Sequence, residues 1–264
     1  MVICINNQKG GTGKTTTTLE LAYLFTILYK LRVLVVDLDP QCSLTKRFGY
    51  KRDTFRGKSI YEVMLSIVHP EASIIDTKYS NLYLLPATKD LAMLDIDLAL
   101  KYQTRYVFDL LKTTLGKVTD NFDIIILDTL PSSGATALNA FSFADYLLIP
   151  TLPEQASLEG LEDLLENVRM IRNKMNTGLH LLGILPFAFD KRLSHHKKAL
   201  TALNNVYSKK FNVPILKNQI GTCTLLKDNV VLKEPASKIY PNERVTESFT
   251  KLCVEIAEII GFIQ

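Results

Sequence analysis

A glycine-rich loop at residues 9–16 has the residue types and the spacing of a phosphate-binding site. It follows an apolar run at residues 2–5 and precedes a helical pattern, and this order directs backbone N–H groups at an anion. Gly10, Gly11 and Gly13 allow the backbone to curl inward, and the start of the helix adds partial positive charge. The sequence therefore predicts a site for the phosphates of a nucleoside triphosphate.

Two side chains of this loop are predicted to have different roles because of their positions. Lys14 is spaced to place a cation on the β- and γ-phosphates, and the hydroxyl of Thr15 is spaced to ligate Mg²⁺. The general pattern would have glycine at position 8, where this chain has Gln8. The full set that we expect to contact nucleotide is Lys9, Gly10, Gly11, Thr12, Gly13, Lys14, Thr15 and Thr16.

Acidic residues end two other apolar runs. Asp37 and Asp39 lie two residues apart after one run, so period two places them on the same side of the chain, and Asp128 ends another. Carboxylates beside a phosphate site cost free energy unless a cation or a water uses them. Aspartate is also a common turn former, so each motif is informative mainly in combination with the loop.

Apolar runs and helical patterns alternate along the chain. Strands are expected at residues 32–37, 82–86, 122–128, 146–150 and 180–185, and helices at residues 15–29, 92–115, 135–143, 158–175, 196–210 and 246–260. Such alternation predicts an α/β fold with a mostly parallel central sheet and helices on both faces. Ligands of such sheets bind at the carboxyl ends of the strands.

Length and composition favour one domain over residues 1–264. The 264 residues are 47% hydrophobic, and no linker, repeat or low-complexity tract interrupts them. The first strand begins at residue 2, so we expect neither a signal peptide nor a separate N-terminal DNA-binding domain. No apolar run approaches the ~20 residues of a membrane span, so a cytoplasmic protein is expected. Four scattered cysteines argue against disulfide or metal chemistry.

Positive charge gathers in the carboxyl-terminal third. The net charge is only +4, but residues 191–198 carry several lysines, an arginine and two histidines. Arg192, Lys197 and Lys198 are the residues we expect to form the core of a polyanion-binding patch. A solvated helix face is the alternative interpretation of the same pattern.

Several motifs together resemble a known family. The loop, with Lys9 ahead of its glycines, resembles the deviant Walker A loop of the ParA/MinD group of P-loop ATPases, and the preceding Asn7 and Gln8 resemble the ParA/Soj partition branch. Residues 37–41 are similar to the family's switch I, and Asp128 with Thr129 to its switch II. Residues 189–192 resemble a stretch that precedes a basic helix. The likeness spans most of the chain.

The resemblance implies specific roles. Lys14 would bind the β- and γ-phosphates of ATP, Thr15 with Asp128 and Asp37 would serve the Mg²⁺ site, and Asp39 would position the attacking water. Lys9 would reach the nucleotide of a second subunit, which implies a homodimer in the ATP state. The family further implies binding to nonspecific double-stranded DNA through the patch at Arg192, association with the nucleoid, and stimulation by a ParB-like DNA-binding protein.

Two departures from the family pattern bear on function. Switch II reads Asp128-Thr129-Leu130-Pro131, where the family commonly has proline in place of Leu130. Ile220 is followed by Gly221, Thr222 and Cys223, where the family typically has arginine, so DNA affinity and the adenine contacts are left open.

Three functions are compatible with such a loop. A partition ATPase is the leading interpretation, and the sequence leaves open whether its cargo is a plasmid or a chromosome. A MinD-like membrane-cycling regulator of cell division is the alternative, but it would need a basic amphipathic tail, and residues 246–260 carry three glutamates against Lys251. We expect that helix to pack on the core instead. A metal or electron carrier would need paired cysteines, and none are suitably spaced.

Overall fold

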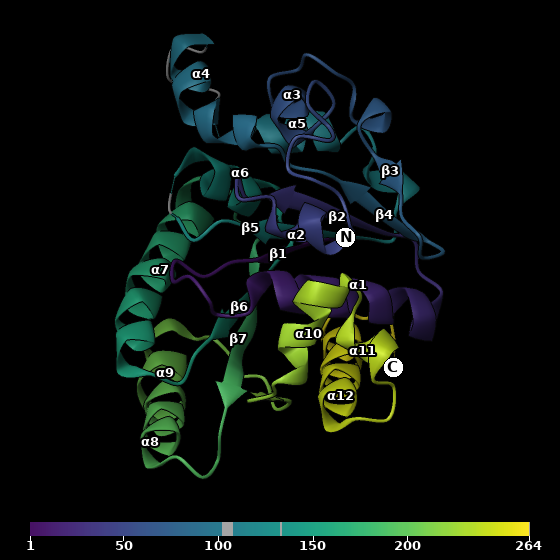
Figure 1. Cartoon of the computed structure of the whole chain (residues 1–264). Coiled ribbons are helices and arrows are strands. Elements are labelled where there is room, and N and C mark those ends of the chain that lie inside the picture. Colours follow the sequence, from purple (N-terminus) through teal and green to yellow (C-terminus); the bar gives the residue numbers. More distant parts are fainter. Residues whose placement is uncertain (102–107, 133, 264) are drawn as a thin grey trace.

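The computed structural model describes residues 1–101, 108–132 and 134–263. Its centre is an eight-stranded sheet in the order β3-β4-β2-β5-β1-β6-β7-β8, in which only the β3–β4 pairing is antiparallel (Figure 1). The strands are β1 (Val2–Ile5), β2 (Val33–Leu38), β3 (Ile75–Asp76), β4 (Leu82–Leu85), β5 (Ile124–Thr129), β6 (Tyr146–Thr151), β7 (His180–Phe189) and β8 (Ile220–Gly221). The expected mostly parallel α/β sheet is confirmed.

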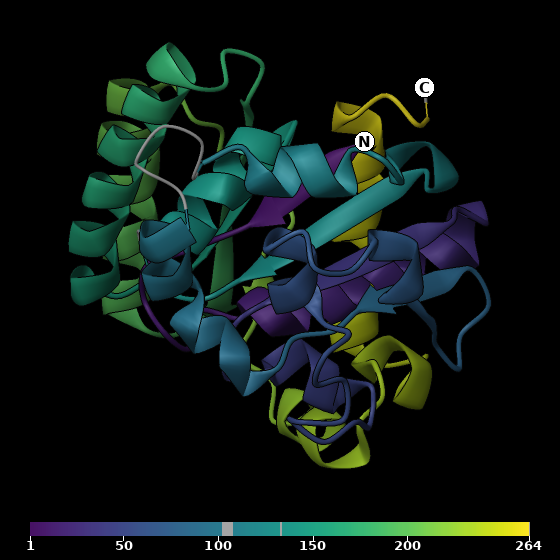
Figure 2. The ribbon, with the colours of Figure 1, turned by 90° about the horizontal axis from the view of Figure 1, so that it is seen from above.

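Helices cover both faces of this sheet (Figures 1 and 2). They are α1 (Lys14–Tyr29), α2 (Ser43–Arg47), α3 (Ile60–Met64), α4 (Leu94–Lys101), α5 (Leu110–Leu115), α6 (Ala135–Phe143), α7 (Gln155–Lys174), α8 (Ser194–Ala202), α9 (Ser208–Phe211), α10 (Leu225–Leu232), α11 (Ala236–Ile239) and α12 (Arg244–Ile259). Short 3₁₀ turns occur at Pro70–Ala72, Lys89–Met93 and Thr119–Asn121, and a π-helical turn at Leu203–Tyr207.

The alternation of side chains along each strand divides the core in two. In β1, Val2 and Cys4 join the cluster that lies under α3, α5, α6 and α7, whereas Ile3 and Ile5 join the cluster under α1 and α12. Strands buried on both faces need apolar residues at every position, because neither face meets water. This explains why the interior strands appear in the sequence as continuous apolar runs.

The structure corrects the expected helix at residues 92–115. The chain forms the 3₁₀ turn Lys89–Met93 and α4, and a separate α5 begins after Asp109, whose backbone (φ −110°, ψ 9°) is not helical. Residues 102–107 of the expected helix lie outside the described part of the chain. The expected helix at residues 196–210 is present as α8, the π-helical turn and α9.

The last helix packs on the core, as expected. Phe249, Leu252, Cys253 and Ile256 are fully buried, and α12 lies along α1. A helix with its apolar stripe buried in this way has little apolar surface left for lipid. Within the described residues, no helix combines the length and the apolar character that a membrane crossing requires.

Candidate nucleotide site

The carboxyl ends of three adjacent strands bring the loop and the acids together. Ile5 at the end of β1 is level with Asp128 on β5, and Asp128 is level with Asp37 on β2. The loop between β1 and α1 therefore opens beside both acids. A cleft of about 1050 Å³ lies there, and the loop residues Gly10 to Thr16 line it together with Asp39.

Two glycines of the loop, Gly11 and Gly13, are required by its backbone conformation. Gly11 and Gly13 have φ of 76° and 90°, the left-handed region that disfavours side chains. A Cβ on Gly13 would also lie 2.5 Å from the ring of Phe187. Around Gly10 and Gly11 a Cβ would meet no atom within 4 Å, so this side of the loop is open for a ligand.

Lys14 is enclosed by the loop that precedes it. Its Nζ donates to the backbone carbonyls of Asn7 (3.0 Å) and Lys9 (3.1 Å), and the residue is buried. Burial lowers the pKa of Lys14, and the nearby charges of Asp128 and Asp39 oppose that shift. The fold thus holds a partly desolvated ammonium group at the base of the phosphate loop.

Thr15 and Asp128 form a pair of oxygen donors beside Lys14. The Thr15 hydroxyl donates to Asp128 Oδ2 (2.8 Å), and the Thr18 hydroxyl lies 3.3 Å from Oδ1. Burial, together with the charge of Asp37, raises the pKa of Asp128 to about 8. A buried carboxyl beside a like charge is stabilised by a cation, and a hydroxyl with a carboxylate suits Mg²⁺, which prefers oxygen ligands. These residues fit the metal.

The two acids of switch I have different surroundings. Asp37 is fully buried, and its Oδ2 accepts from the backbone N–H (2.8 Å) and the hydroxyl (2.7 Å) of Thr45. Its Oδ1 accepts from the N–H of Asp39 (3.1 Å). Burial raises the pKa of Asp37 to about 6. Asp39 instead lines the cleft, with the N–H of Gln41 donating to Oδ1 (2.7 Å). Asp37 therefore stabilises the chain between Asp37 and Thr45 by accepting these hydrogen bonds. Metal ligation by Asp37 stays a prediction.

Lys9 lies at the rim of the loop and reaches a different part of the fold from Lys14. Its Nζ donates to Ser157 Oγ (3.0 Å) and pairs with Glu154 Oε2 (3.3 Å) at the start of α7, and about a third of its side chain is exposed. Of the two lysines in the loop, only Lys14 lines the cleft.

Two arginines of the cleft are not among the residues that the sequence led us to expect at the nucleotide. Arg47 at the end of α2 and Arg52 after it both line the cleft, because the segment that follows Asp39 folds back over the opening. Their spacing after switch I was the available signal. Apolar side chains also line the same cleft: Phe187, Ala188, Cys223 and Leu226.

The expected basic patch lies apart from this cleft. Lys197 and Lys198 are exposed on α8, whereas Arg192 pairs with Asp190 through Nε (3.0 Å) and a terminal nitrogen (2.7 Å). This arginine holds the pKa of Asp190 below its usual value. His196 is buried, and its Nδ1 accepts from the N–H of Asp190 (2.9 Å), so this histidine supports the loop.

Known proteins share both the sequence and the fold. Residues 1–181 match the AAA domain family AAA_31. The chromosome partitioning protein ParA of Myxococcus xanthus is 32% identical over 239 residues, covering 90% of this chain and 83% of that protein. The sporulation initiation inhibitor protein Soj of Bacillus subtilis is 32% identical over 262 residues, covering 97% and 98%.

A solved structure adds the three-dimensional comparison. Cobyrinic acid a,c-diamide synthase from Mycobacterium smegmatis, with bound ATP analogue and magnesium, has a TM-score of 0.82 and 29% identity, and the match covers 96% of this chain and 92% of that one. The two proteins therefore share a fold. Given this fold, this site and the two relatives, the chain belongs to the ParA/Soj family of partition ATPases.

Proposed function

We propose that this chain is a DNA-partitioning ATPase that binds ATP with Mg²⁺, dimerises in that state, and holds nonspecific double-stranded DNA as the dimer. The observation that carries the proposal is the loop, in which a buried lysine lies at the base and a second lysine lies at the rim. The names of the relatives support partition over other uses of this fold.

The residues of the site divide the proposed chemistry. Lys14 would hold the β- and γ-phosphates, and Thr15 with Asp128 would provide oxygen ligands for Mg²⁺, which would supply charge neutralisation. Asp39 faces the same cleft and would orient the attacking water. The apolar lining at Phe187 and Leu226 is our candidate for the base contact, and adenine is the base we propose.

Regulation would come from partners. Phosphoryl transfer needs positioning and charge neutralisation more than covalent chemistry, so a ParB-like DNA-binding protein would act by completing the site. DNA contact through Arg192, Lys197 and Lys198 would place the dimer on the nucleoid. A MinD-like membrane cycle is less well supported, because the apolar face of α12 is buried against the core.

ATP should raise DNA affinity sharply. Dimerisation places two basic patches on one particle and makes the second contact intramolecular. With a labelled duplex of arbitrary sequence, fluorescence anisotropy should report much tighter binding with a non-hydrolysed ATP analogue than with ADP. Arg192→Gln/Lys197→Gln should reduce the slope of log affinity against log salt by about 0.9 for each DNA phosphate that the variant no longer neutralises.

A matched variant keeps this test specific. Lys30→Gln/Lys174→Gln removes two exposed charges at the carboxyl ends of α1 and α7, which lie at the sheet edge opposite the loop, and it should bind like the wild type. The proposed function would be contradicted if the wild type bound DNA equally well with ATP and with ADP. It would also be contradicted if DNA binding were specific to one base sequence.

A further inference from the structure

A second concentration of positive charge lies outside the patch on α8. The basic segment, which we define as residues 46–58, holds six of the 31 lysines and arginines and one of the 27 acidic residues. It therefore carries +5, whereas the whole chain carries +4. Its basic residues are Lys46, Arg47, Lys51, Arg52, Arg56 and Lys58.

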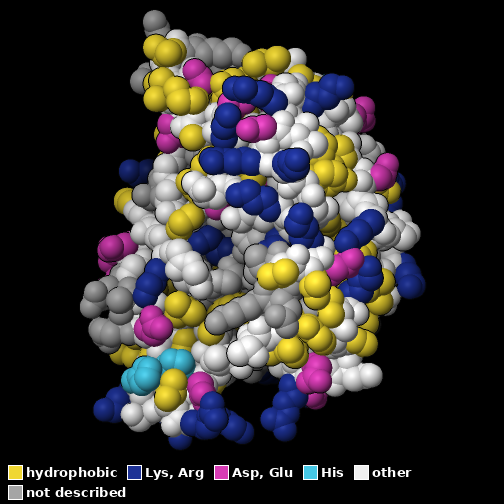
Figure 3. All heavy atoms as spheres, viewed as in Figure 1, with side chains coloured by type: hydrophobic (Ala, Val, Ile, Leu, Met, Phe, Trp, Pro, Cys, Tyr) yellow, Lys and Arg dark blue, Asp and Glu magenta, His cyan; other side chains and the backbone are white. Residues whose placement is uncertain are grey.

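The fold presents this charge on one face of the molecule. Lysine and arginine side chains gather between α2 and α3 (Figure 3), which are the helices that the basic segment connects. Lys46, Lys51, Arg56 and Lys58 are exposed. Like charges at this density repel one another, so a polyanion that binds them would relieve the repulsion.

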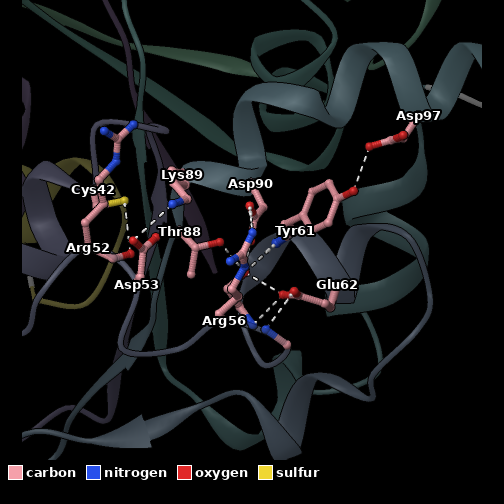
Figure 4. A network of polar contacts seen from close by, with 12 residues as sticks. Cys42, Arg52, Asp53, Arg56, Tyr61, Glu62, Thr88, Lys89, Asp90 and Asp97 are labelled. Atoms are coloured by element: carbon pink, nitrogen blue, oxygen red, sulfur yellow. Dashed lines mark hydrogen bonds and ion pairs between the residues drawn. The ribbon is translucent and has the colours of Figure 1, made fainter.

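Neighbouring acids offset only part of the charge. Asp90 accepts from Arg56 Nε (2.9 Å) and from a terminal nitrogen (3.2 Å), and Asp53 pairs with Lys89 (3.3 Å) (Figure 4). Glu62 faces inward and accepts from the N–H groups of Gly57 (2.9 Å) and Ser59 (2.8 Å). Asp90 thus balances one charge of the basic segment, and Asp53 is shared with Lys89. The segment keeps a net positive charge, and four of its basic residues also line the nucleotide cleft: Lys46, Arg47, Lys51 and Arg52.

The basic segment is also held in place. Arg52 donates through Nε (3.1 Å) and a terminal nitrogen (2.8 Å) to the carbonyl of Pro40, which follows Asp39. At its other end, Ser59 and Glu62 form a capping box at the start of α3. A surface ordered before binding loses less entropy when it binds.

The aromatic rings of the basic segment do not form a protein-binding anchor. Tyr50 and Phe55 pack edge to face with 4.9 Å between ring centres, and the buried Phe48 packs against Tyr79, outside the segment, with 6.4 Å between ring centres. Protein interfaces depend on large side chains inserted into a partner, whereas contacts to nucleic-acid backbones depend on lysine and arginine. The lysine and arginine side chains of this surface suit the consecutive phosphate groups of a nucleic-acid backbone.

We propose that the basic segment is a second contact surface for the phosphate backbone of duplex DNA, separate from α8. This inference rests on the proposed function, because it assigns a further surface to the same DNA-bound state. The clamp from Arg52 to Pro40 joins this surface to the segment that carries Asp39. DNA held here therefore contacts the chain next to the nucleotide cleft.

The test uses Arg56→Gln/Lys58→Gln, because neither residue is among those that line the nucleotide cleft. With the full chain, a labelled duplex and a non-hydrolysed ATP analogue, each DNA phosphate left without its cation should reduce the salt slope by about 0.9 and the affinity at 0.1 M salt by roughly eightfold. Arg56→Lys/Lys58→Arg should bind like the wild type. ATP affinity, measured by calorimetry, should stay within about twofold, since exposed charges are screened.

The outcomes separate the two proposals. If Arg56→Gln/Lys58→Gln binds DNA like the wild type while Arg192→Gln/Lys197→Gln does not, the inference is overturned and the proposed function stands. If ATP affinity falls together with DNA affinity, the basic segment serves the nucleotide and the inference is again overturned. If the wild type itself binds no duplex in the ATP state, both fail. Lys30→Gln/Lys174→Gln controls for the removal of two charges.

Discussion

Replacing Lys14 by alanine is expected to lower ATP affinity by roughly 30-fold to several thousandfold, which corresponds to the cost of about 2–5 kcal/mol when one partner of a buried charge pair is removed. Lys14 is buried at the base of the loop, so no water can replace its contacts fully. Isothermal titration calorimetry with ATP and Mg²⁺ would measure the change. Without nucleotide, thermal unfolding should remain cooperative, because the variant deletes a desolvated charge.

Lys46→Ala is the matched control for that variant. Lys46 lines the same cleft but is exposed, so its charge is screened by solvent and salt. We expect a change of no more than a few-fold in ATP affinity. Equal decreases in Lys46→Ala and Lys14→Ala would mean that general attraction, and not the enclosed ammonium group, holds the phosphates.

Asp39→Ala is expected to lower kcat by about two orders of magnitude or more, which is typical when a group that orients or deprotonates the nucleophile is removed. ATP affinity should be unchanged or slightly higher, because the substitution removes a negative charge that faces the phosphates. The ATP-bound dimer should therefore accumulate. Phosphate release under steady-state conditions, with binding measured separately, distinguishes turnover from affinity.

Asp76→Ala provides the comparison for Asp39→Ala. Asp76 is an exposed aspartate on β3, at the edge of the sheet, and its removal should leave both kcat and KM unchanged. A variant at Asp39 that fails to bind ATP, or that turns over at the wild-type rate, would rule out the water-positioning role.

The sequence predicted the interior of the fold well because its strands are buried on both faces. The run at residues 124–127 is apolar at every position, so it stands out in the sequence, and Asp128 directly after it marks the ligand edge. The edge strands β3 and β8 have two residues each, which is too short for any periodicity. Asp109 interrupts a long helical pattern that carries no proline or glycine signal at that point.

The sequence predicted which loop residues lie in the cleft, and it missed residues that only the tertiary fold brings there. Lys14 and Thr15 have fixed positions within one loop, so the motif alone placed them. Arg47 and Arg52 reach the cleft only because α2 and the basic segment fold over it, a contact between separate parts of the chain. The spacing likewise did not predict that Asp37 is buried while Asp39 lines the cleft, since Thr45, whose hydroxyl donates to Asp37, is eight residues away.

ATP is expected to assemble this chain into a dimer through Lys9. Sedimentation velocity should show the wild type as a monomer with ADP and as a dimer with a non-hydrolysed ATP analogue. Lys9→Ala should bind the analogue and remain a monomer, whereas Glu154→Gln, which removes the partner of Lys9 within its own chain, should still dimerise. A Lys9→Ala protein that forms the dimer as fully as the wild type, or a wild type that stays monomeric with bound analogue, would contradict the account.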